Sequence, residues 1–179
     1  MEDQTIRRRR FLSGVAATPM VAAAQEKPAV TKMPLSIGSD HAGFPLKGPV
    51  IALVKSWGYN VKDCGTYNED PVDFPDIAQK VCDDVLAGRA RRGILVCGTG
   101  VGACIAGNKV RGIRAALCHD TYSAHQCVEH DDVNLLCIGA WIIGIKVAEE
   151  VLRAYLNANF STDEDFRRRV RKLGEMEKR

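Results

Sequence analysis

The sequence lacks the patterns that mark metal centres and nucleic-acid-binding domains. Its seven cysteines include no C-x-x-C pair and no zinc-ligand spacing, so no metal site is indicated. The formal net charge is only +3, and the arginines gathered at Arg7–Arg10 make a basic tip, whereas nucleic-acid binding needs a basic face. Internal repeats and low-complexity segments are also missing. What remains is one ordinary globular domain, because 179 residues with 46% hydrophobic content bury a core but leave little for a second domain.

Residues 1–32 differ from the rest of the chain. The stretch TIRRRRFLSGVAATPMVAAAQ resembles a twin-arginine export signal, matching as Arg8-Arg9-x-Phe11-Leu12, with an A-x-A type cleavage site ending at Ala24. Its apolar run is about half the ~20 residues that span a bilayer, so no stable membrane anchor is expected. We predict a signal and linker over 1–32, a globular domain over 33–179, and an exported or periplasmic protein. A disordered basic tail and a translation start at Met33 are the alternatives, and without a used signal the protein is cytoplasmic.

Short apolar runs alternate with longer amphipathic segments from residue 33 onward. The pattern predicts strands over 35–38, 59–63, 93–97, 113–118 and 135–138, and helices over 45–57, 74–87, 101–110, 122–129, 146–157 and 163–177. Strands that alternate with helices favour a parallel sheet covered on both faces. We therefore predict an α/β protein, a three-layer Rossmann-like fold with a five-stranded parallel sheet flanked by helices.

Polar residues follow four of the predicted strands. In a parallel sheet the carboxyl ends of the strands share one edge, where ligands bind near the switch in strand order. Each residue alone is more typical of a cap or a turn, so their convergence carries the functional interpretation. The four groups are Asp40-His41, residues 63–66, Cys97-Gly98-Thr99-Gly100, and His119-Asp120.

Cys97 ends a predicted buried strand and precedes the glycine-rich turn GTGVG. Glycines let the backbone turn tightly, so that several N–H groups point into the space before the next helix and form an anion or oxyanion cradle. The positive end of that helix should lower the pKa of the thiol from about 8.5 toward neutrality. Such a cysteine suits proton abstraction near neutral pH.

A dinucleotide site is the main rival interpretation of the same loop. Residues 98–103 match G-x-G-x-x-A, and Asp120 follows at a suitable distance after a strand. The loop, however, follows the third strand rather than the first, and too few residues remain for a second nucleotide-binding half with a substrate domain. Cys97 and the Asp40-His41 pair would also have no role.

The chain contains five long motifs, in the order IGSDHAGFPLK, VDFPDIA, GILVCGTGVG, GNKVRGIRAAL and YSAHQCVEHDDVNLLCIGA. Together they resemble one family, the ribose-5-phosphate isomerase B type with its galactose-6-phosphate isomerase relatives. The resemblance runs from Met33 to about Lys178 and implies aldose–ketose interconversion through an enediol, commonly of ribose 5-phosphate and ribulose 5-phosphate, without metal or organic cofactor. It also implies a homodimer, or a higher homo-oligomer, whose sites are built from two subunits.

The resemblance also implies roles for individual residues. Cys97 is the base, while Thr99 and the amides of Gly98–Gly102 stabilise the enediolate. Asp40 and His41 hold sugar hydroxyls, and His130 donates the proton for ring opening, with His119 as a second candidate. The expected substrate-binding set is Asp40, His41, Gly98, Gly100, Val101, Gly102, Asn108, Asp131, Trp141 and Arg169.

Three departures from the family pattern affect how phosphate or sugar is held. Asp131 replaces an asparagine, Trp141 replaces an arginine, and Asp165 stands where the tail usually has its first phosphate-binding arginine, while Arg169 retains the second. Arginine binds phosphate bidentately, so these changes should weaken dianion binding. An isomerase of an unphosphorylated or different sugar, and a non-catalytic sugar-binding relic, therefore stay open beside the pentose phosphate prediction.

Overall fold

The computed structural model describes residues 32–178, so the signal predicted from the N-terminal segment lies outside the described residues. Its sheet contains β1 (Lys32–Ser39), β2 (Tyr59–Asp63), β3 (Arg92–Cys97), β4 (Ala115–Leu117) and β5 (Leu135–Gly139). All neighbouring strands pair in parallel, in the order β2-β1-β3-β5-β4.

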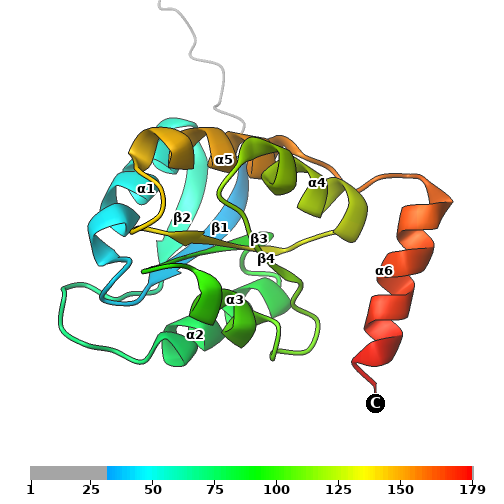
Figure 1. Ribbon diagram of the computed structural model, residues 1–179, viewed down its shortest axis with the longest axis horizontal. Coiled ribbons are helices and arrows are strands. Elements are labelled where there is room, and N and C mark those ends of the chain that lie inside the picture. The colour runs from blue at the N-terminus through cyan, green and yellow to red at the C-terminus, as the bar shows by residue number, and fades with distance from the viewer. Residues whose placement is uncertain (1–31, 179) are drawn as a thin grey trace, which may run out of the picture.

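Helices cover both faces of this sheet. On one face lie α1 (Phe44–Ser56), α4 (Thr121–Asp131) and α5 (Ile145–Asn157), and on the other lie α2 (Phe74–Leu86) and α3 (Val101–Gly107) (Figure 1). The three-layer α/β prediction with five parallel strands is confirmed. Across residues 32–178 no helix is long and apolar enough to cross a membrane.

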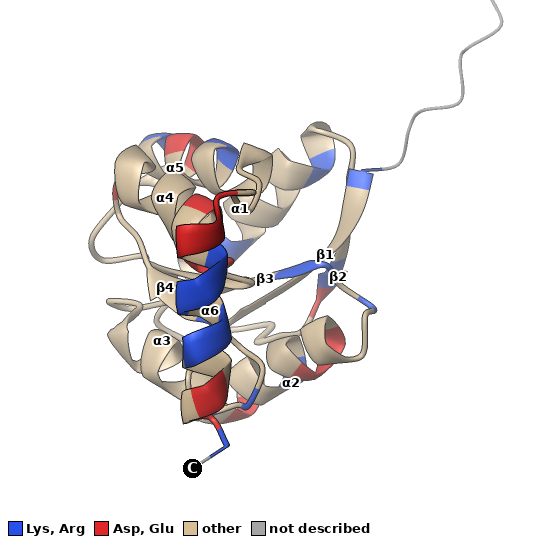
Figure 2. Cartoon of the chain, turned by 90° about the vertical axis from the view of Figure 1, so that its right-hand side faces the viewer, with Lys and Arg blue, Asp and Glu red and all other residues tan. Residues whose placement is uncertain are grey.

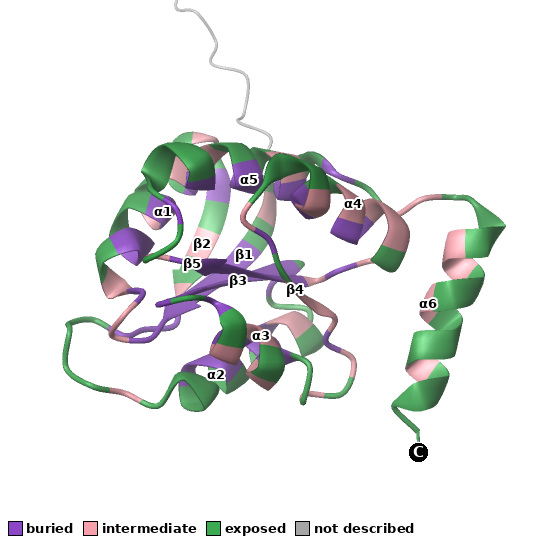
Figure 3. Ribbon diagram, viewed as in Figure 1, coloured by how far each residue is buried: buried purple, intermediate pink, exposed green. Residues whose placement is uncertain are grey.

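The central strand β3 is enclosed along its whole length. All six of its residues are buried, since α2 and α3 cover one face and α1, α4 and α5 the other (Figure 3). That arrangement explains why the sequence here is a continuous apolar run rather than an alternating one. Cys97 therefore sits at the end of a rigid, fully packed strand.

The third helix and the fourth strand are shorter than predicted. α3 ends at Gly107 instead of residue 110, and β4 begins at Ala115 instead of residue 113. The side chain of Asn108 explains the difference, because its Oδ1 accepts from the Ala115 N–H (2.9 Å) and its Nδ2 donates to the Ala115 carbonyl (2.9 Å). These two bonds hold the intervening segment as a turn, in which Gly112 takes a left-handed φ of 86°.

The last helix, α6 (Glu164–Met176), stands apart from the three layers and contacts the body through α4 (Figure 1). None of its described residues is buried. Basic and acidic residues follow one another along it (Figure 2). Arg168 pairs with Asp165 (2.6 Å) and Arg171 pairs with Glu164, so two of the five basic side chains of α6 are paired within the helix.

Candidate active site

The site lies where the strand order of the sheet reverses. Strand β2 pairs with one side of β1, and β3 pairs with the other side. Such a switch point opens a crevice beyond the carboxyl ends of the strands. Ser39 pairs with Val96 in the β1–β3 register. The residues that follow these two positions, Asp40 and Cys97, are consequently neighbours.

Asp40 binds the thiol directly. Cys97 Sγ donates to Asp40 Oδ2 (2.9 Å), and the Gly43 N–H donates to Asp40 Oδ1 (2.8 Å). A Cβ on Gly43 would lie 2.0 Å from the Val96 carbonyl oxygen, so only glycine lets this turn pack on the end of β3. Asp40 was expected to hold sugar hydroxyls, and its contact with the thiol was not predicted. The Asp-x-x-Gly pattern directly after a strand could have indicated a turn built on this carboxylate.

The expected lowering of the Cys97 pKa is wrong. Burial raises the pKa of the thiol, and the hydrogen bond to the Asp40 carboxylate raises it further, while the backbone N–H groups of Gly100 and Gly98 offset only part of the rise. The local helix terminus alone would lower the pKa, whereas burial and a carboxylate from a turn distant in sequence decide the sign of the shift. At neutral pH Cys97 is therefore a protonated thiol that rests on Asp40.

His41 is oriented by the loop that follows β2. The Val72 N–H donates to His41 Nδ1 (3.3 Å), so the ring proton sits on Nε2, which is left as a donor. The loop itself is anchored by Lys47, a buried residue that sequence reasoning missed. Lys47 Nζ donates to Asp63 Oδ1 (2.7 Å) and to the Thr66 carbonyl (2.6 Å). Lys47 lies among the apolar positions of the predicted helix, and this placement could have indicated that its side chain is buried.

His119 lies at the same edge, after β4. Its Nε2 accepts from the Gly139 N–H (2.9 Å), and burial lowers its pKa. Since Gly139 pairs with Cys97 in the β3–β5 register, this histidine braces the strand beside the thiol. With Nε2 committed to the backbone, His119 fits a supporting role better than that of the proton donor for ring opening.

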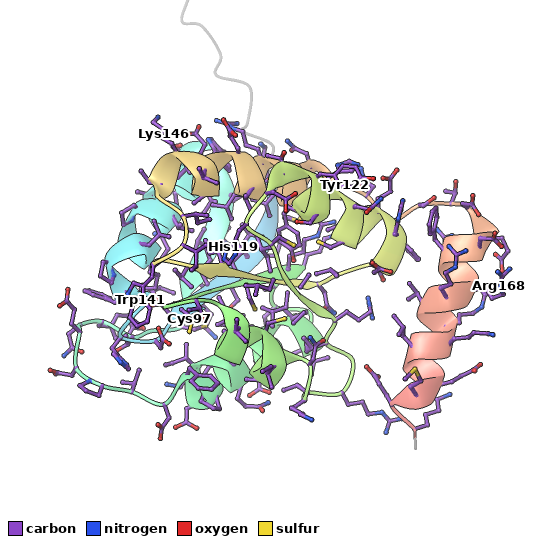
Figure 4. All side chains as sticks on the ribbon, in the orientation of Figure 1. Cys97, His119, Tyr122, Trp141, Lys146 and Arg168 are labelled. Atoms are coloured by element: carbon purple, nitrogen blue, oxygen red, sulfur yellow. The ribbon has the colours of Figure 1, made fainter. Side chains whose placement is uncertain are left out.

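The glycine loop and Trp141 complete this edge of the sheet (Figure 4). The Val101 N–H reaches Thr99 Oγ1 at 3.4 Å, and Gly100 adopts a left-handed φ of 81° as the N-cap of α3. The Trp141 N–H donates to the Gly98 carbonyl (2.9 Å), which ties the residues after β5 to the loop after β3. The structure thus brings together one group of predicted residues: Asp40, His41, Cys97, Gly98, Thr99, Gly100, Val101, Gly102, His119 and Trp141.

A second group of predicted residues lies elsewhere in the chain. Helix α4 starts at the carboxyl edge and runs back across the sheet, so His130 lies near its far end, and the Asp131 carbonyl accepts from Arg114, just before β4 begins. The His130 ring stacks on Phe166 (centroids 3.9 Å apart, 14° between planes), and the Arg169 guanidinium lies 5.4 Å from the Phe166 ring centroid. Phe166, which no sequence pattern had indicated, contacts both His130 and Arg169.

Asn108, which was expected to bind substrate, is bonded to the backbone of its own chain. Both ends of its amide are used by the backbone of Ala115, so it maintains the fold in this structure rather than offering free polar atoms to a substrate. Within residues 32–178, no cluster of three or more His, Cys, Asp or Glu side chains is arranged to hold a metal ion.

Comparison with known proteins shows one family. The family model described as "Ribose/Galactose Isomerase" matches residues 35–173. Ribose-5-phosphate isomerase B of Escherichia coli is 40% identical over 126 residues, which cover 70% of this chain and 85% of that protein. D-erythrulose-4-phosphate isomerase of Pectobacterium atrosepticum is also 40% identical, over 130 residues that cover 70% and 84%.

Solved structures agree with this result. Ribose-5-phosphate isomerase B of Clostridium thermocellum superposes with a TM-score of 0.80 and 43% identity over 82% of this chain and 98% of that one. The enzyme from Mycoplasma genitalium, solved with bound ribulose-5-phosphate, gives 0.77 and 35% over 83% and 98%. The matches displace the dinucleotide interpretation of the Gly98 loop. The chain therefore belongs to the ribose/galactose isomerase family and is an aldose–ketose isomerase.

Proposed function

We propose that this enzyme interconverts ribose 5-phosphate and ribulose 5-phosphate, with Cys97 as the base. The observation that carries the proposal is the Cys97 thiol resting on the Asp40 carboxylate (2.9 Å) beside the glycine loop of the β1–β3 crevice. The relatives from E. coli and M. genitalium, named as ribose-5-phosphate isomerases B, support this choice of substrate.

The geometry suggests how the proton moves. Asp40 takes the thiol proton, and the resulting Cys97 thiolate removes the proton from C2 of the open-chain aldose. The same proton is then delivered to C1, while a hydroxyl proton passes from O2 to O1, so that the ketose forms without any net change in atoms or electrons. The amides of Gly98–Gly102 are the donors for the enediolate oxygen, and His41 Nε2 is a donor for a sugar oxygen.

Ketose formation from ribose 5-phosphate by the purified chain tests the proposal. Replacing Cys97 with serine should lower turnover about 10³-fold, the range typical of a lost general base. Circular dichroism of the variant would show that the fold is kept. A wild-type protein that binds the sugar phosphate without turning it over would instead identify a non-catalytic relic, and turnover unchanged by Cys97→Ser would remove the cysteine from the mechanism.

A homodimer with shared sites is the second part of the proposal. What supports it is the separation of Cys97 from His130 and Arg169, which leaves each site incomplete without a second copy of the chain. A groove of about 510 Å³ between the β4 edge and α6 also offers an apolar surface, with Ile113, Val133, Leu173 and Met176 among its lining residues. Sedimentation velocity would test this, since a monomer at assay concentrations contradicts shared sites.

Export is the third part and rests on the sequence. The Arg8-Arg9-x-Phe11-Leu12 pattern supports twin-arginine transport. Six of the seven free cysteines are buried, as suits a protein that folds before it meets an oxidising compartment. Cell fractionation of the wild type against Arg8→Lys/Arg9→Lys would test it, and wild-type protein found only in the cytoplasm, with a length that starts at Met33, would overturn it.

A further inference from the structure

One cysteine differs from the other six in its exposure. Cys104 on α3 is half-buried, whereas the other six are buried. Its Sγ lies 3.5 Å from the Ala115 carbonyl oxygen and 3.6 Å from Asn108 Nδ2, at the border between α3 and the sheet. The thiol is therefore held in place, while part of the side chain stays open to small molecules from the solvent.

A second thiol lies beneath it. Helix α3 packs closely on β4 and β5, so that a Cβ on Gly107 would lie 2.5 Å from Leu135 Cδ2. Cys104 is three residues earlier on the same helix and packs against the buried apolar cluster that contains Cys137 of β5. The close approach of this helix to the sheet thus places a half-buried thiol next to a fully buried one.

The surroundings of Cys104 favour its thiolate. A hydrogen bond from Cys137 lowers the pKa of the Cys104 thiol to about 7, and a hydrogen bond from Asn108 acts in the same direction, against the effect of burial. Cys97 has the opposite character, because burial and the Asp40 carboxylate raise its pKa. Oxidants attack thiolates rather than thiols, so Cys104 should react first and Cys97 should be spared.

We propose that Cys104 and Cys137 are a redox-active pair, which hydrogen peroxide converts into a reversible disulfide. The Cys104 thiolate attacks one peroxide oxygen, the O–O bond breaks, hydroxide leaves, and a sulfenic acid forms. The Cys137 sulfur then attacks the Cys104 sulfur, and the sulfenic hydroxyl leaves with the Cys137 proton as water. The two sulfur atoms together lose two electrons, which the peroxide accepts, and a dithiol reverses the change.

The disulfide should also lower the activity of the enzyme. Helix α3 begins at Val101, directly after its N-cap Gly100, so its first turn supplies amides of the glycine loop that follows Cys97. The two sulfur atoms must approach to about 2 Å to form the bond, which draws α3 toward β5. A shift of the helix moves those amides away from the enediolate oxygen, and this consequence rests on the proposed function.

Oxidation of the full chain by hydrogen peroxide tests the pair. A non-reduced tryptic digest should contain residues 93–109 linked to residues 115–146. The first peptide also holds Cys97, so tandem mass spectrometry has to assign the bond to Cys104 and Cys137. In parallel, kcat for ribose 5-phosphate should fall about tenfold, because small misplacements of catalytic groups are costly, and should recover with dithiothreitol.

Three variants separate the two thiols. Cys104→Ser should keep its activity under the same exposure to peroxide. Cys137→Ala should stop at the Cys104 sulfenic acid, which dimedone labels. Cys64→Ser is the matched control, because the Cys64 Sγ contacts Ser36 Oγ (3.0 Å) and not this pair, so its activity should fall as in the wild type.

The outcomes distinguish this proposal from the proposed function. A link through Cys97, or one between Cys118 and Cys127, with none between Cys104 and Cys137, overturns the proposal. An equal loss of activity in the wild type and in Cys104→Ser overturns it too, since the loss then comes from another residue. A chain that does not isomerise ribose 5-phosphate overturns the proposed function alone, because the linked peptide is detected without any turnover.

Discussion

The carboxyl edge of the sheet and the α4–α6 end of the molecule both hold residues expected to act in catalysis, but they are built differently. At the edge, Cys97 and Asp40 are buried and fixed by strand register, and His119 and His41 each accept a backbone N–H. At the α4–α6 end, His130 is held by a stack on Phe166, on a helix with no buried described residue. One region is rigid before substrate arrives, and the other depends on a loosely attached helix.

The sharpest test of this division mixes two inactive variants. Cys97→Ala and His130→Ala should each lose about 10³-fold in turnover, because each removes a proton-transfer group. If the two regions serve each other across a dimer, co-refolding equal amounts should restore about a quarter of wild-type activity, since half of the dimers contain one intact site.

Co-refolded wild-type protein provides the control for recovery. Mixed variants that stay inactive while wild type recovers would place both residues in a site formed within a single chain.

Removing the anchor of the rigid region should cost stability. Lys47→Met leaves Asp63 and the Thr66 carbonyl without their buried partner, so the free energy of unfolding should fall by about 2 kcal/mol, less than for a fully buried pair because Asp63 is one-third exposed. Urea denaturation measures the change. Lys55→Met, on the same helix and outside this contact, serves as the control, and equal losses in the two variants would show that Lys47 has no anchoring role.

Asp40 provides a test of the electrostatics at the edge. Its carboxylate contributes to the raised pKa of Cys97, so Asp40→Asn should lower that pKa and move the rise in thiol reactivity to lower pH. Iodoacetamide labelling of Cys97, followed by mass spectrometry as a function of pH, would show the shift. Labelling that moves to higher pH would mean that the thiolate, and not the thiol, is the form that Asp40 favours.

The smallest effect is expected at the α4–α6 end. Phe166→Leu removes the surface on which His130 and Arg169 rest, so kcat/KM for ribose 5-phosphate should fall about fivefold with the fold unchanged. Phe160→Leu is the matched control, because Phe160 lies under Arg167 (5.0 Å) and not beside His130. Similar losses in both variants would point to a general effect on the C-terminal segment.

The same two regions show how far the sequence could lead. The strands, the glycine loop and the gathering of Asp40, Cys97 and His119 at one edge were predictable, since parallel strands carry their following residues to the same side. The contact between Asp40 and Cys97 joins residues 57 positions apart and depends on a register that the sequence does not state. The direction of the Cys97 pKa shift was mispredicted for the same reason, because it depends on that contact with Asp40.

The α4–α6 end was less predictable. A helix that starts at the carboxyl edge must place its last turn far from that edge, so the separation of His130 from Cys97 followed from the expected helix length. No local pattern indicated that Phe166 stacks on His130, because α6 is amphipathic without being buried. Its position depends on a tertiary contact with α4.

Asn108 has a consequence for assembly. Its amide occupies both polar backbone groups of Ala115 on β4, the edge strand of the sheet, in the way that a neighbouring strand would. Another chain approaching this border finds no free donor or acceptor at that residue, so adding a sixth strand there would first require Asn108 to let go. One side chain thus hinders the β4 edge from being extended by a strand of another copy of the protein.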